Sequence, residues 1–166
     1  MAYTRNQARR AQEIELDLFD EFKGIVQALD GAGIDYAVVG AVALAIHGMP
    51  RTTTDIDILI RPEDSERVEK VVQALGFRFP SIPMTFSDSG LTVHRLTKIV
   101  DEDVLTLDML LVCEAMAAIW DGRIQVETDH GRLWVVSRDG LIEMKVLSGR
   151  LRDLVDVKRL QGDEDD

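Results

Sequence analysis

Asp55 and Asp57 alternate with isoleucines in a segment that runs from Asp55 to Ile60. A period of two predicts a β-strand, so both carboxylates leave the same face of it. Like charges at that spacing raise the pKa of one carboxyl group, and a divalent cation between them removes the conflict. Mg²⁺ is the natural choice, because it takes a few carboxylates and completes its octahedron with water and phosphate oxygens. The alternative interpretation is an edge strand with one solvated face.

A third carboxylate, Asp108, interrupts the apolar segment Val104–Val112, which we expect to form a buried strand. One face of that strand is wholly apolar and carries Leu105, Leu107, Met109 and Leu111. An ionised carboxylate in such a strand costs free energy unless it is paired or binds a metal. We therefore interpret Asp108 as a third metal ligand that arrives from an adjacent strand. The alternative is an aspartate bonded to a nearby arginine or to the backbone.

Two groups of residues upstream of Asp55 suit a ligand that carries phosphate. Gly40 and Ala41 stand at a predicted strand-to-helix junction, where small residues let the backbone approach a ligand and a helix N-terminus offers N–H groups. The stretch from Arg51 to Thr54 directly precedes Asp55, and a cation with hydroxyl groups beside a metal suits a polyphosphate. The alternatives are a glycine kept for packing and an ordinary polar loop.

The elements that must position these residues are a mixture of helices and strands. Helical spacing predicts helices over 7–29, 42–46, 62–75 and 114–120, and two C-terminal helices, the first capped by Ser137, that carry 141–147 and 151–160. Strands are predicted over 34–39, 55–60, 91–100 and 104–112, with a hairpin of 124–128 and 132–136. Residues 79–90, rich in proline and serine, are predicted to form a loop. The pattern favours an α+β (α/β) fold around one mixed sheet.

The composition favours a single soluble domain. The chain has 166 residues, 46% of them hydrophobic and 30% charged, which predicts one domain over 1–161 and an acidic tail over 162–166. Its formal net charge of -11 repels nucleic acid at long range. Any contact with nucleic acid therefore needs a local basic patch, a metal or a partner. No stretch approaches a membrane span and no targeting segment is evident, so we expect a cytoplasmic protein without membrane contact.

The order and spacing of these residues resemble the nucleotidyltransferase superfamily of the DNA polymerase beta type. Its signature is a hydrophobic residue, Gly, then Gly or Ser, a short spacer, and Asp-x-Asp on a strand. Here Val39–Ala41 is followed by thirteen residues and then by Asp55–Asp57, with Ala41 as the departure from the pattern. Asp108 is placed to match the third aspartate of the family. The resemblance implies a single-domain nucleotidyltransferase fold, with a mixed sheet flanked by helices and with helices at the C-terminus.

Lys145 and the Arg-x-x-Asp-Leu-x-Asp stretch that follows it resemble a pattern of small bacterial nucleotidyltransferases. That group includes the toxins of abortive-infection toxin–antitoxin systems, which implies a cognate antitoxin or another partner protein. The resemblance also implies that Lys145 contacts the triphosphate and that Asp153 and Asp156 lie near the site or brace it. The alternative is that both aspartates are helix-surface charges paired with Arg150 or Arg152.

The resemblance implies transfer of a nucleoside monophosphate from a nucleoside triphosphate (NTP) to an acceptor hydroxyl group, with release of pyrophosphate. Two Mg²⁺ ions would be held by the catalytic residues Asp55, Asp57 and Asp108. The nucleotide would be bound by Gly40, Ala41, Arg51, Thr54 and Lys145. The acceptor stays open between RNA, a small molecule and a protein side chain. The alternative from another class is a catalytically reduced nucleotide-binding module of the same fold that acts with a partner.

Overall fold

The computed structural model of the chain describes residues 18–50, 52–129, 131–148 and 151–162. Outside these residues lie the beginning of the predicted N-terminal helix, Arg51, Arg150 and residues 163–166 of the acidic tail.

Helices and strands follow one another in the order predicted from the sequence. After an N-terminal helix over residues 18–31, the helices are α2 (Gly40–Ile46), α3 (Ser65–Ala74), α4 (Ala117–Asp121), α5 (Arg138–Ser148) and α6 (Leu151–Gln161), with 3-10 turns at Pro62–Asp64 and Glu114–Met116. The strands are β1 (Ala37–Val39), β2 (Asp55–Ile60), β3 (Phe79–Pro80), β4 (Met84–Thr85), β5 (Thr92–Val100), β6 (Asp103–Leu111), β7 (Ile124–Thr128) and β8 (Gly131–Val135). None of these helices combines the length and the apolar character that crossing a lipid bilayer requires.

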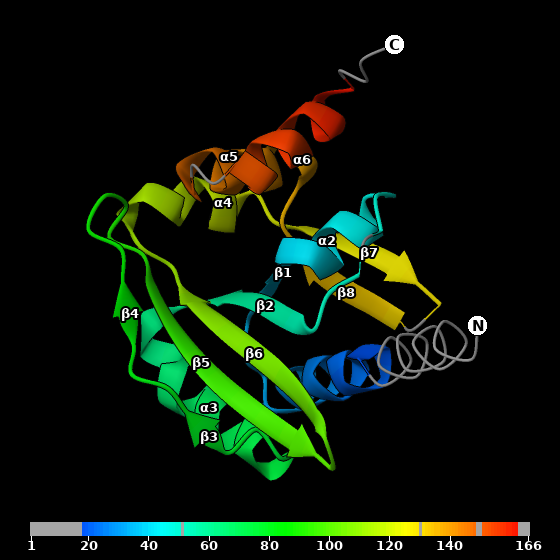
Figure 1. The fold of residues 1–166 in the computed structure, drawn as a ribbon, viewed down its shortest axis with the longest axis vertical. Coiled ribbons are helices and arrows are strands. Elements are labelled where there is room, and N and C mark those ends of the chain that lie inside the picture. The colour runs from blue at the N-terminus through cyan, green and yellow to red at the C-terminus, as the bar shows by residue number, and fades with distance from the viewer. Residues whose placement is uncertain (1–17, 51, 130, 149–150, 163–166) are drawn as a thin grey trace, which may run out of the picture.

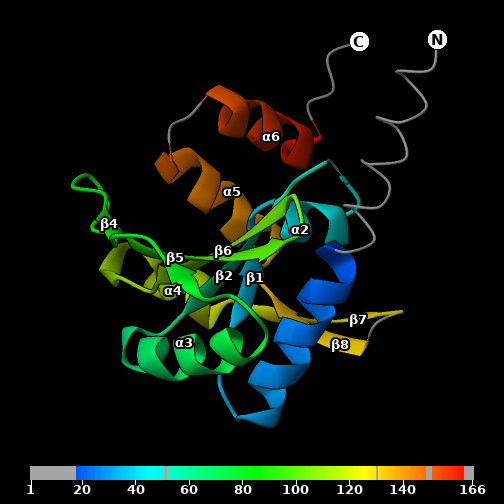
Figure 2. The ribbon, with the colours of Figure 1, turned by 60° about the horizontal axis from the view of Figure 1, so that its bottom comes forward.

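In the described part of the chain, the strands form one eight-stranded sheet in the order β3-β5-β6-β2-β1-β8-β7, with β4 also paired to β5. β2 runs parallel to β6, and β1 runs parallel to β8. The pairs β1–β2, β5–β6 and β7–β8 are antiparallel. The N-terminal helix and α3 lie on one face of the sheet, and α2, α5 and α6 lie on the other (Figures 1 and 2). The predicted α+β fold, a mixed sheet flanked by helices, is confirmed.

The face of the sheet toward the N-terminal helix is closely packed and apolar. On the two central strands it carries Ile56, Ile58, Leu107 and Met109, all fully buried. Lys98 of β5 projects to the same side and donates to Oε1 of Glu21 in the N-terminal helix at 2.6 Å. Because side chains alternate along a strand, the neighbouring positions on β2 and β6 project to the opposite face, toward α2 and α5. Close packing on the apolar face thus fixes the positions of the side chains on the opposite face of β2 and β6.

Two segments differ from the sequence prediction. The strand predicted over 34–39 is paired only from Ala37 to Val39, and residues 79–90 are not a plain loop, because they contain β3 and β4. Both of these two-residue strands pair with the outer edge of β5. Pro80 and Pro83 have no N–H to donate to a ladder, which keeps the pairing short and makes it invisible to a search for strand periodicity.

Candidate functional site

Three charged side chains stand on one rung that crosses three neighbouring strands. In the parallel pair β2–β6, Asp57 is aligned with Asp108, and in the hairpin β5–β6, Asp108 is aligned with Arg95. Residues aligned across paired strands project from the same face of the sheet. All three side chains therefore leave the face that carries α2 and α5.

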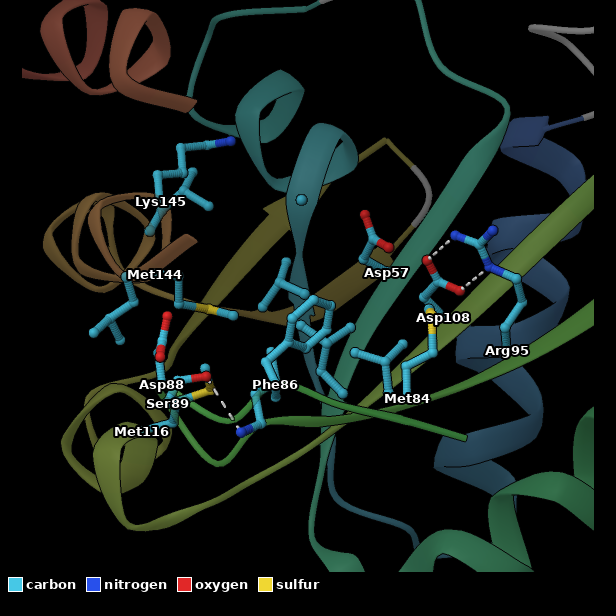
Figure 3. Close-up of a pocket in the computed structure, with 17 residues that line it drawn as sticks. Asp57, Met84, Phe86, Asp88, Ser89, Arg95, Asp108, Met116, Met144 and Lys145 are labelled. Atoms are coloured by element: carbon cyan, nitrogen blue, oxygen red, sulfur yellow. Dashed lines mark hydrogen bonds and ion pairs between the residues drawn. The ribbon is translucent and has the colours of Figure 1, made fainter. Parts of the chain in front are cut away.

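Arg95 holds Asp108 through both of its oxygens. Nε donates to Oδ1 at 2.7 Å and Nη2 donates to Oδ2 at 2.9 Å, as the dashed lines in Figure 3 show. Bidentate pairs of this kind are among the strongest hydrogen bonds in proteins. The contact raises the pKa of Arg95 above its usual value, so the guanidinium stays charged. This is the arginine partner that the sequence allowed as the alternative to a metal.

The carboxylate of Asp57, next to this pair, is surrounded by more negative than positive charge. The pKa of Asp57 is raised to about 7, chiefly by burial and then by the charges of Asp108 and Asp55 and by hydrogen bonding to Asp108. Arg95 lowers the pKa, but by less. A divalent cation relieves such a conflict between like charges, and a donor set of carboxylate oxygens suits a hard cation such as Mg²⁺. The residues around Asp57 thus fit a cation of this class.

Gly40 brings the backbone directly against Asp57. Val39, at the end of β1, is aligned with Asp57 on β2, and Gly40 follows it as the first residue of α2. Gly40 has a φ of 66°, and a Cβ atom at this position would overlap Oδ2 of Asp57. Both the backbone conformation and the lack of space require glycine here.

A cavity of about 390 Å³ lies over the rung (Figure 3). Gly40, Asp57, Asp108 and Arg95 form its polar end, and Lys145 reaches it from α5. Most of the remaining wall is apolar and includes Met84, Phe86, Met116, Met144 and Leu147, with Asp88 beside them. The volume lies in the range of sites for small molecules and cofactors, which are commonly apolar with a few convergent polar groups.

Lys145 is held in place by Asp156 of α6. Its Nζ donates to Oδ2 of Asp156 at 3.2 Å, and the side chains are only 7% and 8% exposed. The proposed alternative of a surface charge is therefore wrong for Asp156, which braces Lys145 instead. The side chain of Asp153 lies outside the part of the chain that the structure describes. The helix that carries Lys145 begins as predicted, because Oγ of Ser137 accepts the N–H of Gly140 at 3.0 Å.

Four of the residues predicted for the site line this one cavity, namely Gly40, Asp57, Asp108 and Lys145.

Other predicted residues lie apart from the cavity wall. Asp55, Ala41 and Thr54 are not part of the lining; Thr54 is exposed, and the N–H of the half-buried Asp55 donates to Oγ1 of Thr53 at 3.1 Å. Arg51 lies outside the described residues. Among the residues that the structure describes, no group of three or more His, Cys, Asp or Glu side chains is arranged to hold a metal ion. Asp57 is nevertheless aligned with Asp108, and Asp55 is close enough for its charge to raise the pKa of Asp57, so the metal-binding role of the three carboxylates stays a prediction.

Sequence reasoning missed Arg95 and the apolar wall. A signal for Arg95 was available, because Val100 pairs with Asp103 across the two-residue turn of the β5–β6 hairpin, and counting back from that turn places Arg95 opposite Asp108. No comparable signal marks Phe86, which follows β4 and is held at the cavity by the pairing of β4 with β5 and by its own hydrogen bond to the carbonyl oxygen of Leu91.

Comparison with known proteins places the chain among nucleotidyltransferases. Residues 16–161 match the family described as nucleotidyltransferase of unknown function (DUF6036). No curated protein matches the sequence. The fold is similar to that of a candidate nucleotidyltransferase from Thermotoga maritima, with a TM-score of 0.62 and 17% identity over 89% of this chain and 94% of that chain.

Two further solved structures share the fold. One is ANT(2″)-Ia in complex with adenylyl-2″-tobramycin, with a TM-score of 0.57 and 16% identity over 90% of this chain and 87% of that chain. The other is a candidate nucleotidyltransferase from H. pylori, with a TM-score of 0.55 and 16% identity over 87% of this chain and 67% of that chain. At these identities the likeness is one of fold.

Proposed function

The chain belongs to the family of nucleotidyltransferases of unknown function that residues 16–161 match, and we propose that it transfers a nucleoside monophosphate from an NTP to a hydroxyl group of a small molecule. The observation that carries this proposal is the alignment of Asp57 with Asp108 below a cavity that Lys145 also lines. In the reaction, the acceptor oxygen bonds to the α-phosphorus, the bond to pyrophosphate breaks, and the acceptor's proton passes to a neighbouring carboxylate.

The charged residues have distinct tasks in this proposal. Asp57, with Asp55 on the same strand face, holds a divalent cation, for which Mg²⁺ is the natural choice. When bound, the cation neutralises charge on the triphosphate and on the departing pyrophosphate. Lys145, fixed by Asp156, lines the same cavity, where its ammonium group would contact the phosphates. Catalysis by this set rests on positioning and on neutralisation of charge.

A small molecule suits the cavity better than a nucleic acid does. The volume of about 390 Å³ and the apolar wall around Phe86 and Met144 match a compact ligand. The net charge of -11 and Asp88 in the cavity wall disfavour a polyanion and favour a neutral or cationic acceptor. ANT(2″)-Ia, which shares the fold, is known in complex with an adenylylated small molecule. We therefore favour a small molecule over RNA or a protein side chain as the acceptor.

A second candidate function is that of a nucleotide-binding module that acts with a partner protein, such as a cognate antitoxin. The observation that favours it is the hold of Arg95 on both oxygens of Asp108. Ala41, where the family signature has Gly or Ser, points the same way. The roles of Ala41, Arg51 and Thr54 in nucleotide binding and the cytoplasmic location stay predictions.

Nucleotide binding that depends on Mg²⁺ tests both candidates together. The melting temperature is measured with each of the four common NTPs, with and without MgCl₂, for the wild type and Asp57→Asn. A ligand at tenfold its Kd adds about 1.4 kcal/mol of stability, or roughly 3–5 °C. We expect such a rise for the wild type only when Mg²⁺ is present, and a much smaller one for the variant. If no NTP raises the wild-type melting temperature, both candidate functions are excluded.

Transfer itself separates the two candidates. The protein is incubated with NTP labelled at the α-phosphate and with three classes of acceptor: aminoglycosides as cationic small molecules, total tRNA, and a cell protein extract. Label on a small molecule supports the first proposal, and label on tRNA or protein corrects its acceptor. Binding of NTP without transfer to any of the three favours the binding module. Asp20→Asn, an exposed aspartate of the N-terminal helix, is the matched control for Asp57→Asn.

A further inference from the structure

Arg95 supplies a permanent positive charge at both oxygens of Asp108, the third carboxylate that the family resemblance assigns to a site with two metal ions. Its guanidinium engages both oxygens of Asp108 at 2.7 and 2.9 Å. The register of the β5–β6 hairpin aligns the two residues, so the backbone positions them for this contact. The guanidinium group is always charged, and a bidentate contact holds it in one orientation beside the carboxylate.

We propose that Arg95 takes the place of one of the two divalent cations, so that the site binds a single divalent cation, held by Asp55 and Asp57. This inference rests on the proposed function, because it assumes that the chain binds NTP together with a divalent cation. Arg95 is then a specificity-determining residue, because its charge fixes the number of divalent cations that the site binds.

The first argument is the occupancy of Asp108. A Mg²⁺ ion needs ligand oxygens at about 2.0–2.1 Å, in nearly octahedral geometry. The side chain of Asp108 is only 12% exposed, and its two oxygens already accept from a guanidinium. An ion at the same oxygens would stand next to the charged guanidinium and be repelled by it. Moving Arg95 away would break a charge-assisted bidentate pair, which is costly when one partner is this buried.

The second argument is the distribution of charge on the rung. Arg95 compensates Asp108 directly through two hydrogen bonds, whereas Asp57, aligned with Asp108, and Asp55, two residues earlier on the same strand face, form no ion pair among the described residues. Unmatched negative charge is therefore left at Asp57 and Asp55, which is where one further cation fits.

A competing arrangement has Arg95 swing into solvent when metal and nucleotide bind, which releases Asp108 for a second ion. The side chain of Arg95 is 40% exposed, so the movement has room. The two arrangements differ in the number of ions bound to each chain. They also differ in whether two ions lie close enough to interact.

Mn²⁺ is the probe that counts these ions. We would titrate Mn²⁺ into the chain in the presence of α,β-methylene ATP, or the same analogue of whichever NTP binds best, with the chain in excess so that little nucleotide is free. Free Mn²⁺ is measured by electron paramagnetic resonance, and the bound spectrum reports whether ions lie in pairs. The wild type is compared with Arg95→Gln. Lys98→Gln is the matched control, because it removes an ion pair from the same strand on the opposite face of the sheet.

We expect one Mn²⁺ per nucleotide-bound chain for the wild type and for Lys98→Gln, with the spectrum of an isolated ion. For Arg95→Gln we expect two, with the broadening of a close pair. Two ions in the wild type would overturn the inference and leave the proposed function intact. One ion with unchanged affinity in Arg95→Gln would also overturn it. If the wild type binds no Mn²⁺ in a nucleotide-dependent way, the proposed function itself fails. If Arg95→Gln does not fold, the wild-type count decides.

Discussion

Lys145 of α5 and Asp156 of α6 form an ion pair inside the protein, with 3.2 Å between Nζ and Oδ2 and less than a tenth of either side chain exposed. The pair connects the two C-terminal helices and also fixes the charged ammonium group of Lys145, which lines the cavity. Removing one member of a buried pair leaves the other charge in a poorly solvated place. One contact therefore serves both the stability of the helices and the orientation of Lys145.

Replacing Asp156 by Asn is expected to lower the free energy of unfolding by about 3 kcal/mol, at the lower end of the range for a broken buried pair. The amide keeps the shape but removes the charge that faces Lys145. Urea denaturation measures the change. Glu127→Gln is the matched control, because it breaks the exposed pair of Arg132 and Glu127 and should cost less than about 1 kcal/mol. Equal losses in the two variants would contradict the buried role of Asp156.

Gly40→Ala is expected to abolish binding of NTP, because the methyl group would displace the carboxylate of Asp57. The positive φ adds a backbone cost of about 1–2 kcal/mol. Gly33→Ala separates these two effects. Gly33 has nearly the same φ, 67°, but nothing lies within 4 Å of the place that a Cβ atom would take there. Gly33→Ala should therefore lose a similar amount of stability through the backbone alone and still bind NTP with Mg²⁺ normally, as measured by thermal shift.

The pH dependence of stability in the absence of metal should reveal Asp57. The pKa of Asp57 is about 7 in the folded chain, against about 3.9 in an unfolded chain. The folded state therefore binds the proton more tightly, and the contribution of Asp57 to stability is lost as the pH rises from about 4 to about 7. In EDTA, the free energy of unfolding of Asp57→Asn should therefore increase relative to that of the wild type as the pH is raised from 5 to 8.

Mg²⁺ should act in the opposite sense, because a cation competes with the proton at Asp57. Adding Mg²⁺ is expected to stabilise the wild type more at pH 8 than at pH 5.5, and to stabilise Asp57→Asn little at either pH. Denaturation curves at the two pH values, with and without Mg²⁺, check this. A stabilisation by Mg²⁺ that is equal at both pH values, or equal in the variant, would contradict a cation at Asp57.

The residues of the site differed in how far the sequence could reveal them. Asp57 and Asp108 were found because alternation assigns a face to each residue of a strand, and a carboxylate in a buried strand needs a reason. Arg95 was missed because its partner depends on register, which is set by the two-residue turn at Asp101 and Glu102, where Asp101 takes a φ of 54°. A hairpin with one more residue in the turn would place Arg95 elsewhere.

The apolar wall was less accessible to sequence reasoning. Met84 and Phe86 lie in a segment whose prolines and serines predict a loop, and two-residue strands have no period to detect. The pairing of β4 with the edge of β5, continued by the hydrogen bond from the N–H of Phe86 to the carbonyl oxygen of Leu91, brings this segment over the rung. Such tertiary placement is decided by the neighbouring strand and not by local propensity.

Phe86→Ala is expected to weaken ligand binding without unfolding the protein. Phe86 lines the cavity and is 50% exposed, so a bound ligand would cover an aromatic ring that is now partly in water. Loss of that contact should cost about 1 kcal/mol, or roughly fivefold in affinity. The matched control is Phe79→Ala, on the same edge of the sheet and 57% exposed, but not part of the cavity wall. The free energy of unfolding of both variants should lie within about 1 kcal/mol of the wild-type value, because neither ring is buried.

Two constants, the Kd for NTP with Mg²⁺ and the KM for the acceptor, show which ligand contacts the ring of Phe86. A change in the Kd places the base of the nucleotide against Phe86, and a change in the KM places the acceptor there. If neither constant changes, or if Phe79→Ala changes them equally, the apolar wall is not part of the binding site.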